Sequence, residues 1–259
     1  MKVMIWGLLT VLLMFVAPLS AQTNRTIQEL KVSAENGNAL DQFGLGLLYY
    51  SGKDVTNDNV EAVKWVRKAA EQNLALAQSF LGQCYAEGIG VATNQTEAVK
   101  WFRKAAEQGN SEAQYNLGCS YYNGKGVEKD YAEAVKWTRK AAEQNDADAQ
   151  FSLGDSYGSG KGVAKNDIEA AKWYRKAAEQ DHTDAQNNLG VSYAFGTGVV
   201  KDYVEGYKWL DLAAAKGSKN AKELMTVLEN KMTPEQIAEG QQLAREFKPH
   251  KASSFNSLF

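Results

Sequence analysis

The sequence has few of the residues that metal and catalytic sites commonly use. Its 259 residues include only three prolines, two cysteines and two histidines. His182, His250 and two widely separated cysteines cannot supply a ligand set with the usual spacing of a zinc site. The sequence therefore predicts neither a bound metal nor a cofactor.

The chain also lacks an excess of either charge. It carries 29 Lys and Arg against 31 Asp and Glu, for a net charge of −2. Nucleic-acid binding usually requires a basic patch, so we expect no nucleic-acid partner. The scarcity of proline, together with abundant alanine, glutamate, lysine and glutamine, favours helix throughout.

Only the start of the chain has a long apolar run. Lys2 precedes an uncharged apolar stretch at residues 3–16, and small residues ending at Ala21 come before polar Gln22. The stretch is shorter than the ~20 residues of a membrane-spanning helix, and the pattern is typical of a secretory signal peptide. We expect residues 1–21 to be removed. The mature protein is then periplasmic or secreted, without stable membrane insertion.

Four sets of residues recur every 36 positions over most of the chain. Chance does not keep four such series in phase over five periods, so the chain is a tandem array. The series are Trp65, Trp101, Trp137, Trp173 and Trp209; Tyr49, Tyr85, Tyr121, Tyr157 and Tyr193; the Leu-Gly pairs beginning at Leu45, Leu81, Leu117, Leu153 and Leu189; and the Ala-Ala pairs beginning at Ala69, Ala105, Ala141, Ala177 and Ala213.

Each period predicts two helices. The first contains the Leu-Gly pair and ends at a glycine pair such as Gly88 and Gly90, because glycine tolerates the left-handed backbone that ends a helix. The second begins after an Asp or Asn such as Asp58, with Glu61 three residues later, which predicts a capping box. Its tryptophan and alanines form an apolar stripe, and the opposite charged stripe predicts a solvated face.

The repeat, clearest from Ala113 to Gly126 and from Asp130 to Ala142, resembles the Sel1-like repeat, a relative of the tetratricopeptide repeat. The resemblance covers residues 27–230. It implies an all-α fold, a right-handed α/α superhelical solenoid of tandem 36-residue repeats. We expect an N-terminal capping helix at 22–37, the solenoid at 38–230, a C-terminal capping helix at 231–248 and a flexible tail at 249–259.

Solenoids commonly bind partners on an extended concave face. If the first helices line that face, the residues that vary between repeats are candidates for contacting a protein or peptide, because exposed aromatic groups act as anchors. An alternative is that Phe80 and Phe151 only fill gaps between repeats. The candidates are Phe80, Gln83, Asn116, Tyr122, Phe151, Asp155 and Asn188.

One motif resembles a catalytic one. Residues 154–158 match the G-x-S-x-G pattern of a hydrolase nucleophile, but that motif requires a strand-to-helix turn and here lies in a predicted helix. Some cysteine-rich Sel1-like relatives have been linked to β-lactam hydrolysis, yet this chain lacks their regular cysteine pairs. Cys84 and Cys119, 35 residues apart, are either a disulfide or two thiols.

The sequence thus predicts a non-catalytic scaffold or adaptor of the cell envelope, or a secreted one, that binds a protein or peptide on its concave face. Two alternatives stay open. One is a hydrolase that acts on cell-wall or β-lactam-type substrates, and the other is a structural envelope protein that associates with itself.

Overall fold

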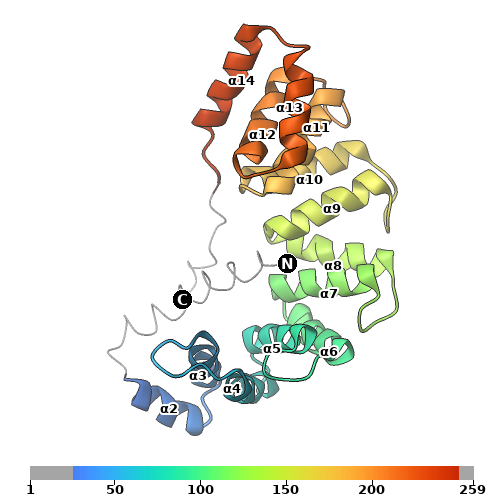
Figure 1. Cartoon of the computed structure of the whole chain (residues 1–259). Helices are drawn as coiled ribbons and strands as arrows, with labels where there is room; N and C mark the ends of the chain where they lie inside the picture. The colour runs from blue at the N-terminus through green and yellow to red at the C-terminus, as the bar shows by residue number, and fades with distance from the viewer. Residues whose placement is uncertain (1–25, 251–259) are drawn as a thin grey trace. The chain divides into compact units, whose positions relative to one another are not determined.

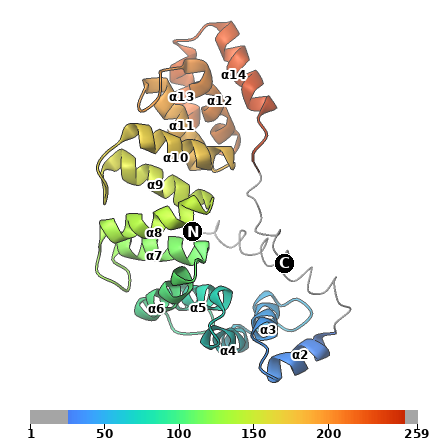
Figure 2. The same cartoon turned by 180° about the vertical axis from the view of Figure 1, so that it is seen from behind.

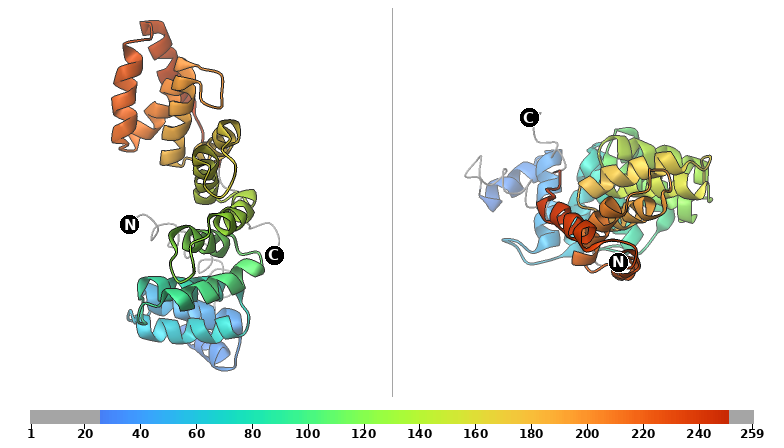
Figure 3. Two further views of the ribbon diagram at one scale, coloured as in Figure 1. Left: turned by 90° about the vertical axis from the view of Figure 1, so that its right-hand side faces the viewer. Right: turned by 90° about the horizontal axis from the view of Figure 1, so that it is seen from above.

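A computed structural model describes residues 26–250. The predicted signal peptide, residues 22–25 of the predicted N-terminal cap and residues 251–259 of the predicted tail lie outside the described residues. Within 26–250 the chain forms thirteen helices and no strand. The views in Figures 1, 2 and 3 show helices joined by loops. The described residues divide into two compact units, residues 26–113 with 125–127, and residues 114–124 with 128–250.

Ten of the helices form five pairs, each pair occupying one 36-residue period. The first helices of the pairs are α3 (Ala39–Ser51), α5 (Ala75–Glu87), α7 (Ser111–Asn123), α9 (Ala147–Ser159) and α11 (Thr183–Phe195). The second helices are α4 (Asn59–Glu71), α6 (Gln95–Glu107), α8 (Tyr131–Glu143), α10 (Asp167–Glu179) and α12 (Tyr203–Ala215). The two helices of a pair pack side by side, as α3 does with α4 in the first unit and α9 with α10 in the second.

The second helices begin where the Asp/Asn pattern predicts, but with a different cap. Asp58 accepts hydrogen bonds from the backbone N–H groups of Val60 and Glu61, both at 3.0 Å. The predicted capping box does not form in these helices, because the Glu61 carboxylate bonds Lys64 Nζ at 2.8 Å instead of returning to the N-cap backbone. Glu97, Glu133 and Glu169 pair in the same way with the lysine three residues on.

Two glycines follow the first helix in four of the five repeats, and they have different functions; in the first repeat Asp54 stands in place of the second glycine. Gly160 ends α9 in the left-handed conformation (φ +73°), as predicted. Gly162, also at φ +73°, lies against the first residue of α8: a Cβ there would be 2.0 Å from the Tyr131 carbonyl oxygen. Gly90, Gly126 and Gly198 lie equally close to the start of the second helix of the preceding repeat. The second glycine therefore joins neighbouring repeats.

The core follows the repeat. The leucine of each Leu-Gly pair is at most 1% exposed, and the glycine beside it lets the paired helix approach, as where a Cβ on Gly154 would be 2.7 Å from the Tyr174 ring. Four of the five periodic tryptophans are buried and Trp65 is half-buried. Lys104 Nζ lies 4.2 Å from the ring centroid of Trp101, and this cation–π contact recurs at Trp65, Trp137 and Trp173.

A series of buried glutamines links one repeat to the next. Gln150, 2% exposed, donates to the carbonyl of Ala142 at the end of the preceding helix and accepts from Gln180 at 2.7 Å. Gln78 makes the equivalent bonds with Ala70 and Gln108. Buried polar groups are stable only when hydrogen-bonded, and here each amide supplies the partner that a helix end lacks.

The ends of the array are closed by helices that depart from the repeat. At one end α2 (Ile27–Glu35) takes the place of a second helix, since Gln42 donates to the Ala34 carbonyl as Gln78 does to Ala70. At the other, α13 (Lys219–Glu229) and α14 (Pro234–Glu246) pack on α12 (Figure 2). Helix α14 starts with N-cap Thr233 and a proline at its first position.

The segment after α14 folds back onto the last repeat. The Phe247 ring lies 5.3 Å from that of Trp209, edge to face. The His250 backbone N–H donates to the Glu179 carbonyl at the end of α10, at 2.8 Å. Phe247 packs on Trp209 in the last repeat. Three residues after this tryptophan the chain has Leu212, whereas the other four repeats have a lysine there.

Candidate functional site

The seven predicted residues do not all share one environment. Phe80 is 5% exposed and packs against Phe43 and Tyr50 in the core of the first unit. This is the position that the gap-filling alternative describes. Gln83, half-buried, donates to Glu87 on its own helix. Within the first unit, these residues therefore do not form a shared surface.

In the second unit, three of the seven residues come together. Asp155 on α9 accepts a hydrogen bond from Asn188 on α11 at 3.3 Å. One turn before Asp155 on α9, half-buried Phe151 stacks on the ring of His182 with 4.8 Å between centroids. Asn116 and Tyr122 lie on α7, and Tyr122 is 38% exposed. These side chains and their neighbours on α7, α9 and α11 are called the first-helix face below.

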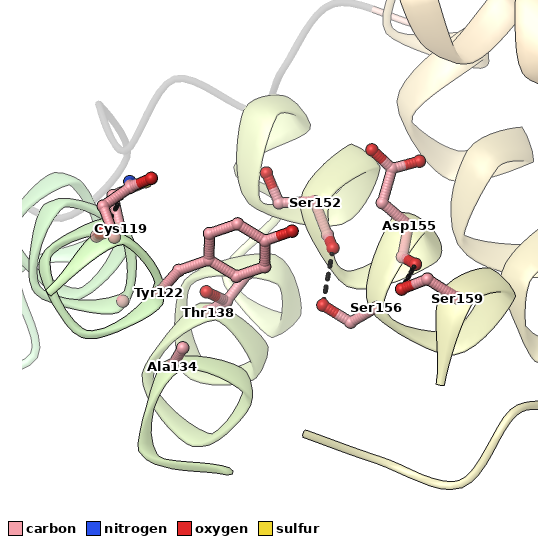
Figure 4. A pocket seen from close by; sticks show the side chains of 10 residues that line it. Cys119, Tyr122, Ala134, Thr138, Ser152, Asp155, Ser156 and Ser159 are labelled. Carbon is pink, nitrogen blue, oxygen red and sulfur yellow. Dashed lines mark hydrogen bonds between the residues drawn. The ribbon is translucent and has the colours of Figure 1, made fainter. Parts of the chain in front are cut away.

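A pocket of about 180 Å³ lies between α7, α8 and α9 (Figure 4). The Tyr122 ring extends from α7 toward α9 across it, and Cys119 and Thr138 line its other side. The wall on α9 bears hydroxyl groups, those of Ser152, Ser156 and Ser159.

The hydroxyl hydrogens of two of these serines are already used. Ser156 donates to the Ser152 carbonyl at 2.9 Å, and Ser159 donates to the Asp155 carbonyl at 2.7 Å (Figure 4). A serine hydroxyl has one hydrogen and two lone pairs. These two oxygens can therefore offer only lone pairs to a ligand, so the α9 wall of the pocket favours a hydrogen-bond donor.

Asp155 is held in a partly desolvated position. Its carboxylate accepts from the Tyr174 hydroxyl at 2.7 Å as well as from Asn188. Burial raises the pKa of Asp155 above its ordinary value, against the hydrogen bond from Tyr174, which acts to lower it. Burial, followed by the hydrogen bond to Asp155, raises the pKa of Tyr174. A carboxylate kept under this constraint is a candidate for binding.

The structure adds two residues that the sequence analysis did not single out. Asp148 accepts from His182 Nε2 at 3.1 Å, although the two are 34 residues apart. His182 Nδ1 accepts the backbone N–H of Ala185 as the N-cap of α11, so Nε2 carries the hydrogen. The available signal was the spacing of Asp148 and Asp155, which places both on one side of α9.

The comparisons with known proteins identify the repeat. The Sel1 repeat model matches five consecutive segments: residues 39–74, 75–110, 111–146, 147–182 and 183–218. The chain belongs to the Sel1 repeat family. The predicted fold class, an all-α solenoid of tandem 36-residue Sel1-like repeats, is thereby confirmed. Sel1 repeat proteins are generally protein–protein interaction scaffolds.

Two solved structures show the same likeness at the level of the whole chain. A protective antigen present in uropathogenic Escherichia coli strains, with an SLR fold, is 33% identical with a TM-score of 0.79, covering 92% of this chain and 53% of that one. A Sel1 repeat protein from Oxalobacter formigenes is 32% identical with a TM-score of 0.72, covering 85% of this chain and 65% of that one. The chain thus spans less than two thirds of either relative. No curated protein matches it.

In this Sel1 repeat protein the G-x-S-x-G segment is part of a helix. Ser156 lies inside α9 and donates to the carbonyl four residues earlier. Ser120 and Ser192, at the same position of their repeats, do the same. A nucleophile elbow instead exposes its serine at a sharp turn after a strand. Ser156 is therefore placed as a repeat residue, not as an elbow nucleophile.

Neither cysteine is in a disulfide in the described residues. Burial raises the pKa of the Cys84 thiol to about 12, whereas half-buried Cys119 lines the pocket. In residues 26–250 no group of three or more His, Cys, Asp or Glu side chains is arranged to hold a metal ion. No helix of that part has the length and apolar character that crossing a membrane requires.

Proposed function

We propose that this Sel1 repeat protein is a non-catalytic scaffold that binds a protein or peptide on the first-helix face of α7, α9 and α11. The observation that carries the proposal is the contrast between the two sides of the repeat. The second helices repeat the same ion pairs and the same lysine–tryptophan contacts. The first-helix face presents different side chains in each repeat, including half-buried Phe151 and exposed Tyr122.

The repeated ion pairs of the second helices and the varied side chains of the first-helix face suit different purposes. The ion pairs of the second helices are solvent-exposed, and such pairs contribute little to stability individually and carry no specificity. Aromatic groups combined with fixed hydrogen-bonding groups give an interface its anchors. The α7–α9 pocket adds a concave feature beside them.

The test places a photo-cross-linking residue on each side. Variants with the cross-linker at Asn116 or Asn188 sample the first-helix face, and variants at exposed Glu128 or Glu143 serve as matched controls. After irradiation of native cells, we expect adducts of one defined mass from the first two variants only. Adducts confined to the control positions, or none from any variant, would contradict the proposal.

We also propose that the protein acts outside the cytoplasm, in the periplasm or as a secreted protein. The support is the Lys2, apolar and Ala21 pattern at the N-terminus. Mass spectrometry of the protein isolated from its native envelope or culture fluid should give Gln22 as its first residue. Recovery from the cytoplasm with Met1 or Lys2 retained would count against export.

A further inference from the structure

Basic residues are absent from the first helix of every pair, whereas acidic residues occur in both kinds of helix. The five first helices contain no Lys or Arg, while α4, α6, α8 and α10 each contain two Lys and one Arg. Any Asp, Glu, Lys or Arg side chain that a first helix offers to a partner is therefore acidic. The acidic residues of the first helices are Asp41, Glu87, Glu112, Asp148, Asp155 and Asp184.

The clearest case is one side of α9. Asp148, Phe151, Ser152 and Asp155 follow one another at helical spacings of three, one and three residues, and so lie along one face. The two aspartates are seven residues apart, which at 1.5 Å per residue separates their backbones by roughly 10 Å. Half-buried Phe151 lies between them. The stripe thus offers two carboxylates with an aromatic surface in the middle.

Both carboxylates are positioned by neutral donors. His182 holds Asp148, whose side chain is 60% exposed, and Tyr174 with Asn188 holds Asp155. Within the described residues neither aspartate pairs with a lysine or arginine. A carboxylate fixed without a cationic partner retains its attraction for a cation and loses little further freedom on binding one.

Two further observations point to a cationic ligand. The Ser156 and Ser159 oxygens face the α7–α9 pocket as acceptors, because their hydrogens are bonded to backbone carbonyls. At the edge of the pocket the chain itself provides an example: Lys161 donates to the Tyr122 hydroxyl at 3.0 Å, with Nζ 5.4 Å from the centre of that ring. Acceptors and an aromatic ring are the groups that bind an ammonium or guanidinium head.

We propose that the first-helix face of α7, α9 and α11 binds a basic segment of its partner, in which two Lys or Arg side chains reach Asp148 and Asp155. An apolar side chain between the two basic ones packs on Phe151. This inference rests on the proposed scaffold function and specifies the chemistry of the partner. The ~10 Å spacing corresponds to basic residues three apart in an extended segment or seven apart in a helical one.

The test selects short random peptides displayed on phage against the purified chain, followed by affinity measurements with synthetic copies of the enriched peptides. We expect enriched peptides to carry two Lys or Arg at one of these spacings with an apolar residue between. The double variant Asp148→Asn with Asp155→Asn should bind them about tenfold more weakly, since exposed charge pairs are individually modest. Added salt should weaken wild-type binding further.

Control variants distinguish an effect of this surface from an effect of the protein's net charge. Glu128→Gln with Glu143→Gln removes the same two charges from exposed positions outside the first-helix face and should leave affinity unchanged. Asparagine can still accept from His182, Tyr174 and Asn188, so the double variant keeps the local hydrogen bonds.

The inference fails if no peptide is enriched, if enriched peptides carry no excess of Lys or Arg, or if both double variants weaken binding equally. The cross-linking experiment is independent of these results. A native partner that cross-links at Asn116 or Asn188 but lacks a basic segment at the cross-linked site would leave the scaffold function standing and overturn only this inference.

Discussion

Individual buried polar residues contribute to the repeat as much as the apolar ones do. Gln150 illustrates this, because its amide bonds a helix-end carbonyl, the Asn145 side chain and the next repeat's Gln180. Gln150 and Ala142 are each 2% exposed, whereas Asn145 is exposed and Gln180 is half-buried. Removing the amide therefore leaves the buried Ala142 carbonyl unsatisfied, which is more costly than losing an exposed hydrogen bond.

We therefore expect Gln150→Ala to lower the free energy of unfolding by about 2 kcal/mol, a value within the usual cost of an unsatisfied buried group. Urea unfolding followed by circular dichroism measures the change. Gln83→Ala is the matched control, since Gln83 is half-buried and bonds only Glu87 of its own helix. Its effect should stay within about 0.5 kcal/mol. Equal losses in the two variants would refute the structural role of the glutamine series.

Asp155, unlike Gln150, should lower the stability of the folded protein at neutral pH. Its pKa is raised in the folded protein, chiefly by burial, so folding disfavours the ionised carboxylate. The folded state then binds the proton more tightly than the unfolded state, and this destabilising contribution is present above the folded pKa. It disappears as the pH falls below 3.8, the ordinary value of the group.

Asp155→Asn is accordingly expected to raise the melting temperature at neutral pH. The gain should shrink as the pH is lowered and vanish once aspartate is protonated in both states. Melting curves of wild type and variant over this range test the sign. A residue that costs stability, at a position proposed to bind a partner, fits the common conflict between stability and function. A lower melting temperature of the variant at neutral pH would show that Asp155 is structural.

At the scale of the helices and loops, much of the structure was predictable from the sequence. The 36-residue period fixed where each second helix begins, as after Asp58, and where each first helix ends, as at Gly160. These signals act within a few residues of the chain, so they can be read without coordinates. The capping box at Glu61 was wrongly predicted because Lys64, three residues later, competes for the same carboxylate.

Contacts between repeats were not predictable in the same way. Phe80 and Phe151 both look like varying aromatic residues, but they occupy repeat positions that differ by one residue, which turns a helical side chain by about 100°. Phe80 consequently packs on Phe43 and Tyr50 of the preceding first helix, while Phe151 stacks on His182. The partnership of Asp148 with His182 likewise depends on how α9 and α11 lie side by side.

The glycine loops give a prediction about elements. Gly160→Ala and Gly162→Ala both force alanine to φ +73°, which costs about 1–2 kcal/mol. At Gly160 the nearest atom to the new Cβ is the Lys165 Cβ at 3.3 Å, whereas at Gly162 it is the Tyr131 carbonyl oxygen at 2.0 Å. We expect Gly162→Ala to be the more destabilising by at least about 1 kcal/mol, the range in which packing clashes fall.

Urea unfolding of the two variants side by side makes this comparison. Both variants bear the cost of the left-handed conformation, so this cost cancels when their free energies of unfolding are compared. Similar losses would mean that the second glycine serves only the loop and does not join α8 to the following repeat.

At the scale of the array, stability depends on each repeat covering its neighbour. A solenoid repeat contacts only adjacent repeats, so a defect should weaken in effect with each repeat away from it. The last repeat has no following repeat, and Phe247 covers Trp209, which is 4% exposed. Lys208 Nζ lies 4.7 Å from the centroid of the Trp209 ring. In the preceding repeats the lysine three residues after the tryptophan lies over the ring, and Trp137 and Trp173 are each 8% exposed.

Phe247→Ala should therefore open the second unit from its C-terminal end. Hydrogen exchange measured by mass spectrometry is expected to rise most in α12 and α14, less in α10, and least in α8, because each interface transmits only part of the loss. Phe195→Ala offers a control at a phenylalanine that is 61% exposed, where exchange should not change. Uniformly faster exchange from α8 to α14 would instead show that the second unit unfolds as one cooperative body, and that the Phe247–Trp209 contact supports all of it rather than its last repeat.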